Sequence, residues 1–247
     1  MKTLGKLSQI AILSLATAFV VGCGGGGDSS SSNTDTNTTT ETIITHNGVD
    51  YKTVTSPTTG RVWLDRNLGA AEVCQTFNDT ACYGDYYQWG RNADGHQDSA
   101  SSTTTARATN VTNVGHPFFI KGNSDWAKNG VDNSGATRVA NWSKTDGSSV
   151  CPVGFRVPTK AELSAEFSTN NIHNRVDAFN SFLKLPSAGV RLYNGAMYGV
   201  GSKGAIYTAT PYSVPLRAYD IYYTISQVGV YHPSYTNGLT IRCIKAQ

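Results

Sequence analysis

The chain has 247 residues, of which 15% are charged, and its formal net charge is +3 at pH 7. Two of the positive charges, Lys2 and Lys6, lie in the first 22 residues, which contain no acidic residue, so removing them from +3 leaves +1. A charge this small excludes the strong positive field of nucleic-acid-binding proteins, and we expect no nucleic-acid partner.

The first 22 residues have the pattern of a bacterial signal peptide. Lys2 and Lys6 precede an almost wholly apolar run over residues 10–21. A membrane-spanning helix takes roughly 20 apolar residues, so this run is too short to cross a bilayer. Its length fits the apolar part of a signal peptide instead, and we expect residues 1–22 to be removed on export.

Cys23 follows the sequence Val-Val-Gly, which resembles the lipobox of bacterial lipoproteins. The resemblance implies that Cys23 is acylated and that its lipid holds the chain to a membrane; the alternative is an ordinary secretory signal with an incidental cysteine. The next residue is Gly24 rather than aspartate. By similarity to enterobacterial sorting rules, this favours the outer membrane as the location in the bacterial cell envelope.

Residues 23–42 are expected to form a disordered tether. A run of glycines is followed, over residues 28–42, by Ser, Thr, Asn, Asp and Glu alone. Such a segment has no apolar side chains with which to build a core. The folded domain is therefore expected to span residues 43–247, held at a distance from the membrane.

Four cysteines remain besides Cys23, an even number that indicates two disulfides in an exported chain. Three pairings are open. We favour Cys74–Cys82, which closes a short loop, and Cys151–Cys243, which ties the C-terminal strand to the middle of the domain. The five histidines are scattered and no CxxC pair is present, so we expect no metal site of this kind.

The first part of the domain is predicted to begin with two strands and continue into a long irregular region. Residues 48–54 alternate as a strand does, and residues 61–65 form the returning strand after a turn. Residues 91–150 are polar and lack periodicity, which is typical of a functional or irregular loop region. Trp126 and Trp142 are expected to hold this region against the body of the domain.

Helices are predicted next. Thr159 and Glu162 have the spacing of a capping box, so a helix is expected to begin there. A second helix is expected over residues 175–184, where apolar residues recur on one face.

The last part of the chain is predicted to be strands. Asn194 and Gly195 suit a tight turn between strands at residues 190–193 and 196–200. Further strands are expected at residues 205–210, 218–226, 228–231 and 239–244. The predicted fold class is therefore α+β, with mostly antiparallel strands, two main helices and long loops.

Several segments in order resemble the Fibrobacter succinogenes major paralogous domain family. They are residues 48–54 (GVDYKTV), 62–70 (VWLDRNLGA), 83–91 (YGDYYQWGR), 94–96 (DGH), 151–162 (CPVGFRVPTKAE), 185–189 (LPSAG) and 241–245 (IRCIK). The resemblance spans nearly all of residues 46–247. It departs at residues 207–209, where this chain has Tyr-Thr-Ala and relatives often carry a Trp-Ser-Ser-like segment.

The family is similar to a variety of the C-type-lectin-like fold. The resemblance implies that the two ends of the domain pair as strands and that a loop-rich face lies opposite. It also supports the pairing of Cys151 with Cys243. Residues 155–162 resemble a segment of formylglycine-generating enzymes, which share the fold.

The densest candidate for a ligand-binding surface is C-terminal, where residues 207–235 hold seven of the thirteen tyrosines. Tyrosine offers rigid amphipathic area, and short polar groups adapt their hydrogen bonds, as at other binding surfaces. The region resembles the ligand face of C-type-lectin-like proteins and the variable region of retroelement-diversified proteins. The expected ligand-binding residues are Tyr207, Tyr212, Tyr219, Asp220, Tyr222, Tyr223, Tyr231, His232, Tyr235 and Asn237.

The sequence therefore predicts a surface lipoprotein that binds an extracellular protein or glycan, or mediates adhesion. Tyrosine is also common in strands, and alternation buries about half of the side chains, so each single tyrosine is equally well explained by packing. The alternative from another class is a structural envelope lipoprotein without a specific ligand.

We expect no enzymatic activity. Formylglycine-generating enzymes need a pair of reactive cysteines near the C-terminal part of the fold, and only Cys243 lies there. A carboxylate pair of the glycosidase type among Asp65, Glu72, Asp79 and Asp85 is a weaker hypothesis.

No cofactor is expected, although a structural calcium ion is left open. Calcium binds several oxygen ligands, including carboxylates. The long polar region contains four candidates, Asp94, Asp98, Asp125 and Asp132.

Overall fold

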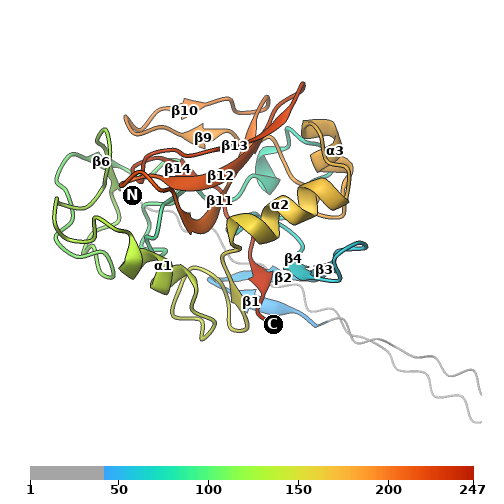
Figure 1. The fold of residues 1–247 in the computed structure, drawn as a ribbon, viewed down its shortest axis with the longest axis horizontal. Helices are drawn as coiled ribbons and strands as arrows, with labels where there is room; N and C mark the ends of the chain where they lie inside the picture. Colours follow the sequence, from blue (N-terminus) through green and yellow to red (C-terminus); the bar gives the residue numbers. More distant parts are fainter. Residues whose placement is uncertain (1–41) are drawn as a thin grey trace, which may run out of the picture. The chain divides into compact units, whose positions relative to one another are not determined.

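The computed structural model describes residues 42–247, so the predicted signal peptide, Cys23 and nearly all of the tether lie outside the described residues. No helix within the described range is long and apolar enough to cross a membrane. Short strands, mostly antiparallel, are combined with three α-helices and one short 3-10 helix in this part of the chain. The domain is therefore α+β, as predicted (Figure 1).

The described chain begins with a hairpin rather than with the single strand predicted over residues 48–54. Strand β1 (Ile44–His46) pairs with β2 (Val49–Tyr51) across a turn at Asn47 and Gly48, whose φ angles are 49° and 78°. Asn-Gly favours such a turn because both residues tolerate positive φ. The chain then breaks before β3 (Thr53–Thr55), so the predicted strand is divided between two sheets.

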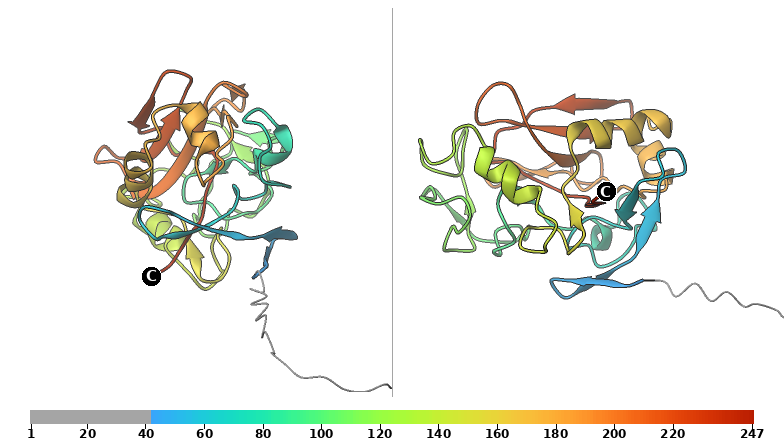
Figure 2. Two further views of the ribbon diagram at one scale, coloured as in Figure 1. Left: turned by 90° about the vertical axis from the view of Figure 1, so that its right-hand side faces the viewer. Right: turned by 60° about the horizontal axis from the view of Figure 1, so that its bottom comes forward.

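The two ends of the domain meet in one four-stranded sheet, in the order β3-β4-β15-β8. Strand β15 (Ile244–Lys245) lies between β4 (Val62–Leu64) and β8 (Phe155–Arg156), antiparallel to both (Figure 2). The strand predicted over residues 239–244 is in fact two short pieces, β14 (Gly238–Leu239) and β15.

The predicted capping box is present at the start of α2 (Lys160–Thr169). The Thr159 side chain accepts a hydrogen bond from the Glu162 backbone, and the Glu162 side chain accepts one from the Thr159 backbone. Helix α3 (Arg175–Asn180) is shorter than predicted because Ser181 adopts an extended conformation that ends it. Helix α1 (Ala136–Trp142), inside the long polar region, was not predicted.

The sheet that supports the candidate site is antiparallel and has the order β11-β12-β13. Its strands are β11 (Gly204–Pro211), β12 (Ala218–Tyr223) and β13 (Val228–Tyr231). Helix α2 covers one face, where Ile221 and Tyr223 pack with Phe167 (Figure 1). Because side chains alternate along a strand, Asp220 and Tyr222 point to the opposite face.

A second antiparallel sheet has the order β10-β9-β14-β5. The predicted hairpin at Asn194-Gly195 is confirmed, with β9 (Val190–Arg191) and β10 (Met197–Tyr198) shorter than expected. Strand β5 (Tyr87–Gln88) completes this sheet through its pairing with β14. In the long polar region, β6 (Thr103–Thr104) and β7 (Phe119–Ile120) form a parallel pair.

The long polar region is held to the core as predicted, because Trp126 and Trp142 are both fully buried. Arg138 from α1 is also buried: it donates to Asp125 at 2.8 Å, and its guanidinium lies 4.4 Å from the Trp126 ring and 4.8 Å from the Tyr235 ring. A buried charge is tolerated when it is paired in this way. The region is thus a folded part of the domain and not a free loop.

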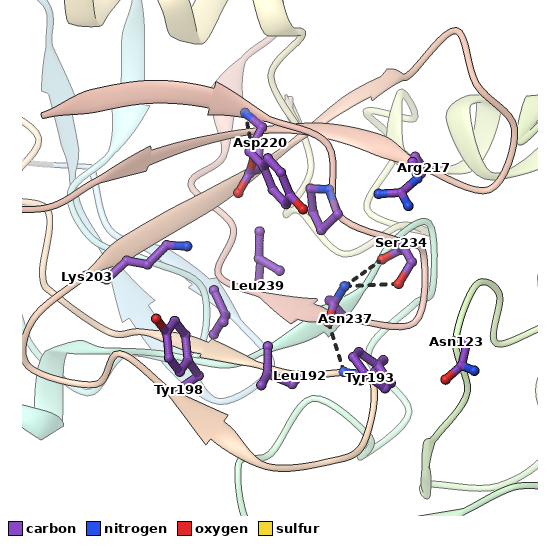
Figure 3. Close-up of a pocket in the computed structure, with 13 residues that line it drawn as sticks. Asn123, Leu192, Tyr193, Tyr198, Lys203, Arg217, Asp220, Ser234, Asn237 and Leu239 are labelled. Atoms are coloured by element: carbon purple, nitrogen blue, oxygen red, sulfur yellow. Dashed lines mark hydrogen bonds between the residues drawn. The ribbon is translucent and has the colours of Figure 1, made fainter.

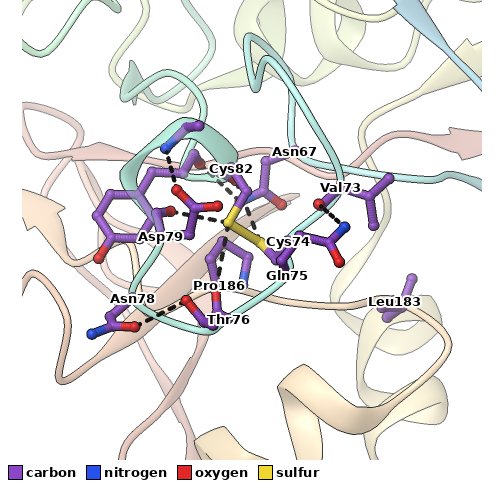
Figure 4. Close-up of a disulfide and its surroundings, with 12 residues drawn as sticks. Asn67, Val73, Cys74, Gln75, Thr76, Asn78, Asp79, Cys82, Leu183 and Pro186 are labelled. Atoms are coloured by element: carbon purple, nitrogen blue, oxygen red, sulfur yellow. Dashed lines mark hydrogen bonds between the residues drawn. A yellow bond between two sulfur atoms is a disulfide. The ribbon is translucent and has the colours of Figure 1, made fainter.

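Both favoured disulfide pairings are confirmed. Cys74–Cys82 closes a loop beside the 3-10 helix η1 (Thr80–Cys82), whose first turn is capped by Asp79 (Figure 4). Cys151–Cys243 joins residues 92 positions apart and lies next to the sheet that contains β15.

Candidate functional site

A cavity of about 300 Å³ lies between the β9–β10 hairpin and the ends of β12 and β13. Asn123 contributes from the long polar region, and every other lining residue comes from positions 190–239 (Figure 3). The floor is apolar and the walls are polar and aromatic. The lining residues are Asn123, Val190, Leu192, Tyr193, Tyr198, Lys203, Arg217, Asp220, Tyr231, Pro233, Ser234, Asn237 and Leu239.

Asp220 is the buried carboxylate of this cavity. It lies on the face of β12 away from α2, opposite Tyr207 on β11 and Tyr231 on β13. Its Oδ1 atom accepts a hydrogen bond from the Tyr231 backbone N–H at 3.1 Å, and its own backbone N–H is a second donor to the carboxylate. Burial raises the pKa of Asp220 to about 7, although the charge of Lys203 opposes the shift.

Two cationic side chains, Lys203 and Arg217, line the same cavity as the carboxylate, and Lys203 interacts electrostatically with it. Lys203 precedes β11, and its ammonium lies 5.2 Å from the Tyr222 ring and 6.0 Å from the Tyr198 ring. Arg217 precedes β12 and donates to the His232 carbonyl at 3.1 Å. Both cations are therefore held by aromatic or backbone partners, and both remain partly accessible.

Asn237 fixes one wall of the cavity. Its Oδ1 atom accepts from the Tyr193 backbone N–H at 2.9 Å, and its Nδ2 atom donates to the Ser234 hydroxyl at 3.0 Å (Figure 3). The side chain thereby ties the β9–β10 hairpin to the segment that precedes β14. Its polar atoms are engaged in shaping the cavity.

An aromatic stack supports the rim of the cavity. The rings of Tyr231 and His232 are stacked at 5.0 Å, and those of His232 and Tyr212 at 4.0 Å. Tyr212 meets the Tyr219 ring edge-on at 5.1 Å, and the Lys160 ammonium lies 4.2 Å from that ring. Tyr231 is 49% exposed, yet its ring is held in place by this stack. Rigid, exposed aromatic area of this kind is typical of binding surfaces.

Three of the ten predicted ligand-binding residues line the cavity, and four more are connected to it through side-chain contacts. Asp220, Tyr231 and Asn237 line it, and Tyr222 contacts its Lys203. The other three belong to the aromatic stack and are Tyr212, Tyr219 and His232.

The prediction was wrong for Tyr207, Tyr223 and Tyr235, which are at most 1% exposed. The Tyr207 hydroxyl donates to the Ser234 and Asn237 carbonyls, and that of Tyr223 donates to the Pro186 carbonyl. Tyr235 stacks on Trp89 at 4.3 Å. Tyr207 and Tyr223 lie on opposite faces of the sheet and both are covered, whereas Tyr219 and Tyr222 in β12 are only partly buried.

Sequence reasoning missed ten of the thirteen lining residues, five of which have polar or aromatic side chains at the walls: Tyr193, Tyr198, Lys203, Arg217 and Asn123. Tyr193 and Tyr198 flank the predicted Asn-Gly turn, so their place on an exposed hairpin could have been recognised. Lys203, Arg217 and Asn123 had no such signal, because tertiary folding alone brings them to the cavity.

The buried Asp94–His96 pair resembles part of a catalytic triad but is fully engaged. His96 Nδ1 lies 2.7 Å from Asp94, and His96 Nε2 accepts the Gln88 backbone N–H at 3.0 Å. Burial lowers the pKa of His96 to about 4, so the ring is neutral at pH 7. With both nitrogens occupied, this histidine has no free nitrogen to serve as a general base.

The acidic residues of the long polar region also have partners. Asp125 and Asp132 both lie next to the Arg138 guanidinium, and Asp98 accepts the Ala100 backbone N–H. Within residues 42–247, no group of three or more His, Cys, Asp or Glu side chains is arranged to hold a metal ion.

A second cavity, of about 330 Å³, lies between the β1–β2 hairpin and the body of the domain. Asp85 lines it and accepts a hydrogen bond from the Tyr87 hydroxyl at 3.3 Å. Burial raises the pKa of Asp85 to about 6. Asp85 therefore resembles Asp220 in its electrostatics while lying in a different cavity.

Comparison with known proteins identifies no relative: no protein-family model, no curated protein and no solved structure matches the chain.

Proposed function

We propose that residues 43–247 form a C-type-lectin-like domain of the Fibrobacter succinogenes major paralogous type, which binds an extracellular ligand and is displayed on the bacterial envelope by lipid on Cys23. The observation that supports it best is the cavity at residues 190–239, with its exposed aromatic rim. Small-molecule and glycan sites are concave, partly apolar and lined by a few convergent polar groups, and this cavity has each of these properties.

The ordered rim of the cavity is a second observation that supports ligand binding. A ligand gains affinity when the surface that it meets is already ordered. Tyr231 is held by the stack with His232 and Tyr212, and the opposite wall is fixed by Asn237. Ordered, exposed tyrosines are not required on a surface that binds no ligand.

Ligand binding is tested with beads that carry the full chain, washed over surfaces coated with mucin, cellulose, peptidoglycan or albumin. We expect retention on at least one surface other than albumin. Replacing Tyr193, Tyr198 and Tyr231 together by alanine should abolish it, because these exposed rings form the rim.

The matched control replaces three comparably exposed apolar residues that do not line the cavity, namely Phe118, Val153 and Ile225. This variant should be retained like the wild type, and thermal melting should show that both variants remain folded. Equal retention of the two variants, or no retention of the wild type on any surface, would refute the proposal and favour a structural envelope role.

The anchor is tested separately by metabolic labelling with a fatty-acid probe. We expect the wild-type chain to incorporate the probe and the Cys23→Ser variant to lose it, because the thiol is the acylated group. Equal labelling of the two would contradict the proposed anchor.

A further inference from the structure

The Asp220 carboxylate lines the cavity and can accept more hydrogen bonds than the described residues donate to it. Its donors among the described residues are two backbone N–H groups, that of Tyr231, through Oδ1, and its own, whereas two carboxylate oxygens together accept about four hydrogen bonds. A buried polar group without enough partners is costly to the fold. Because Asp220 lines an open cavity, the missing donors come from water or from a ligand that takes the place of that water.

The surrounding charges restrict which donors fit. A cationic ligand would meet two positive side chains, Lys203 and Arg217, against one carboxylate. An anionic group placed at the base of the cavity would be repelled by the Asp220 carboxylate. Neutral hydroxyl groups avoid both penalties, because they donate to Asp220 and accept from the two cations.

The walls and the size point to the same class of ligand. Tyr193, Tyr198 and Tyr231 offer ring surface to the apolar C–H face of a sugar, and Leu239 and Val190 contribute apolar floor. About 300 Å³ is at the small end of the range for small-molecule sites, which suits one ring and not a long chain.

We propose that this cavity binds one uncharged pyranose unit of a glycan, with hydroxyls on adjacent carbons donating to the Asp220 carboxylate and a third accepting from Lys203. This inference rests on the proposed ligand-binding function and names its ligand class. No metal ion takes part in the contact.

The test measures binding of methyl glycosides of glucose, galactose, mannose and N-acetylglucosamine by saturation-transfer NMR and calorimetry. The full chain is held in a detergent without sugar groups, so that the detergent does not compete. Methyl glucuronide and glucosamine serve as the anionic and cationic probes. We expect at least one uncharged glycoside to bind, with both charged probes at least tenfold weaker.

Asp220→Asn is the decisive variant, because the amide keeps the shape and can still accept from the Tyr231 N–H. We expect it to weaken glycoside binding roughly ten- to a hundredfold, the range for losing a charged hydrogen-bond partner. Asp85→Asn is the matched control, a carboxylate in the other cavity, and it should bind like the wild type. Wild-type affinity should also fall between pH 8 and pH 6, and this fall should be absent from Asp220→Asn.

The outcomes separate this inference from the broader proposal. If no uncharged glycoside binds, or Asp220→Asn binds as well as Asp85→Asn, the sugar assignment is wrong. If the bead assay still depends on the three rim tyrosines in that case, the domain binds a ligand of another class. If both assays fail, the ligand-binding function fails with the sugar assignment.

Discussion

At the scale of single residues, Asp220 combines burial in the sheet with access to the cavity. Burial of a carboxylate favours its protonated form, which raises the pKa from 3.8 to about 7. Because the unfolded chain ionises first as pH rises, the residue makes folding progressively less favourable between about pH 4 and pH 7. This cost in stability accompanies the position of Asp220 at the cavity, where the proposed ligand would contact it.

Asp220→Asn should therefore stabilise the domain at pH 8, by up to roughly 3–4 kcal/mol for a shift of about three pKa units. The gain should shrink toward zero as pH falls to 4, where wild-type Asp220 is neutral. Chemical denaturation of both proteins at several pH values measures this difference. A constant difference across the range would show that the charge of Asp220 is not what costs stability.

His96 is expected to have the opposite dependence on pH. Its pKa is about 4 in the fold and 6.5 when unfolded, so the unfolded chain alone binds a proton between these values. The stability that neutral His96 provides is present above pH 6.5 and is lost as pH falls toward 4, by up to about 3 kcal/mol. In the His96→Gln variant, the free energy of unfolding should decline less between pH 6.5 and pH 4 than it does in the wild type. If the decline is unchanged, other titratable groups cause it.

The residue types in the sequence identified some of the residues that line the cavity but not all of them. Tyrosine and short polar residues indicated the segment that supplies most of the cavity lining, and a surface rich in them is well suited to binding. Which tyrosines face outward depends on whether one or both faces of a strand are covered. Tyr207 and Tyr231 have the same residue type and both lie in edge strands, β11 and β13, so only the packing of other segments over Tyr207 separates core from rim.

At the scale of elements, local signals were reliable where they specify backbone geometry. The Thr159–Glu162 capping box and the Asn194-Gly195 turn were both predicted and found. Strand lengths were less predictable, because two-residue strands such as β14 and β15 are defined by their partners and carry no periodicity. The hairpin at Asn47-Gly48 was overlooked although it has the same turn signal.

Thr159→Ala should destabilise the domain by about 1 kcal/mol, the usual cost of losing an N-cap hydroxyl. The variant loses the acceptor for the Glu162 backbone N–H and the hydroxyl that donates to the Glu162 carboxylate. Chemical denaturation measures the effect. Thr105→Ala is the control, because the Thr105 side chain is exposed and forms no hydrogen bond in the described part, and it should change stability by far less.

At the scale of the whole domain, the two disulfides constrain the chain very differently. They join residues 8 and 92 positions apart. In the chain-entropy account, removing a cross-link costs about 2.5 kcal/mol for the shorter loop and about 4.6 kcal/mol for the longer one. The Cys151→Ala/Cys243→Ala variant should thus unfold at clearly lower denaturant than Cys74→Ala/Cys82→Ala. The reverse order would show that the short bridge stabilises the domain by other means.

The fold class was predictable because alternation, turns and caps are local features of the sequence. The arrangement of the sheets was not predictable, because it depends on contacts between distant segments. The cavity needs Asn123, the β9–β10 hairpin and β12–β13 to meet, and no pattern in the sequence states that they do. The two ends of the domain share one sheet, although β15 pairs with β4 and β8 and not with the strands of residues 44–55.

Twelve of the thirteen residues that line the cavity come from positions 190–239, and this segment is secured at both ends. Before it, Leu183 and Leu185 are fully buried; after it, Cys243 is bonded to Cys151 and β15 is paired on both sides. We therefore expect the outward side chains of this segment to be exchangeable without loss of the fold, whereas its buried residues such as Tyr207 and Tyr223 belong to the core. Changing its outward side chains, or grafting those of another protein onto it, should alter the ligand while leaving the frame that holds it unchanged.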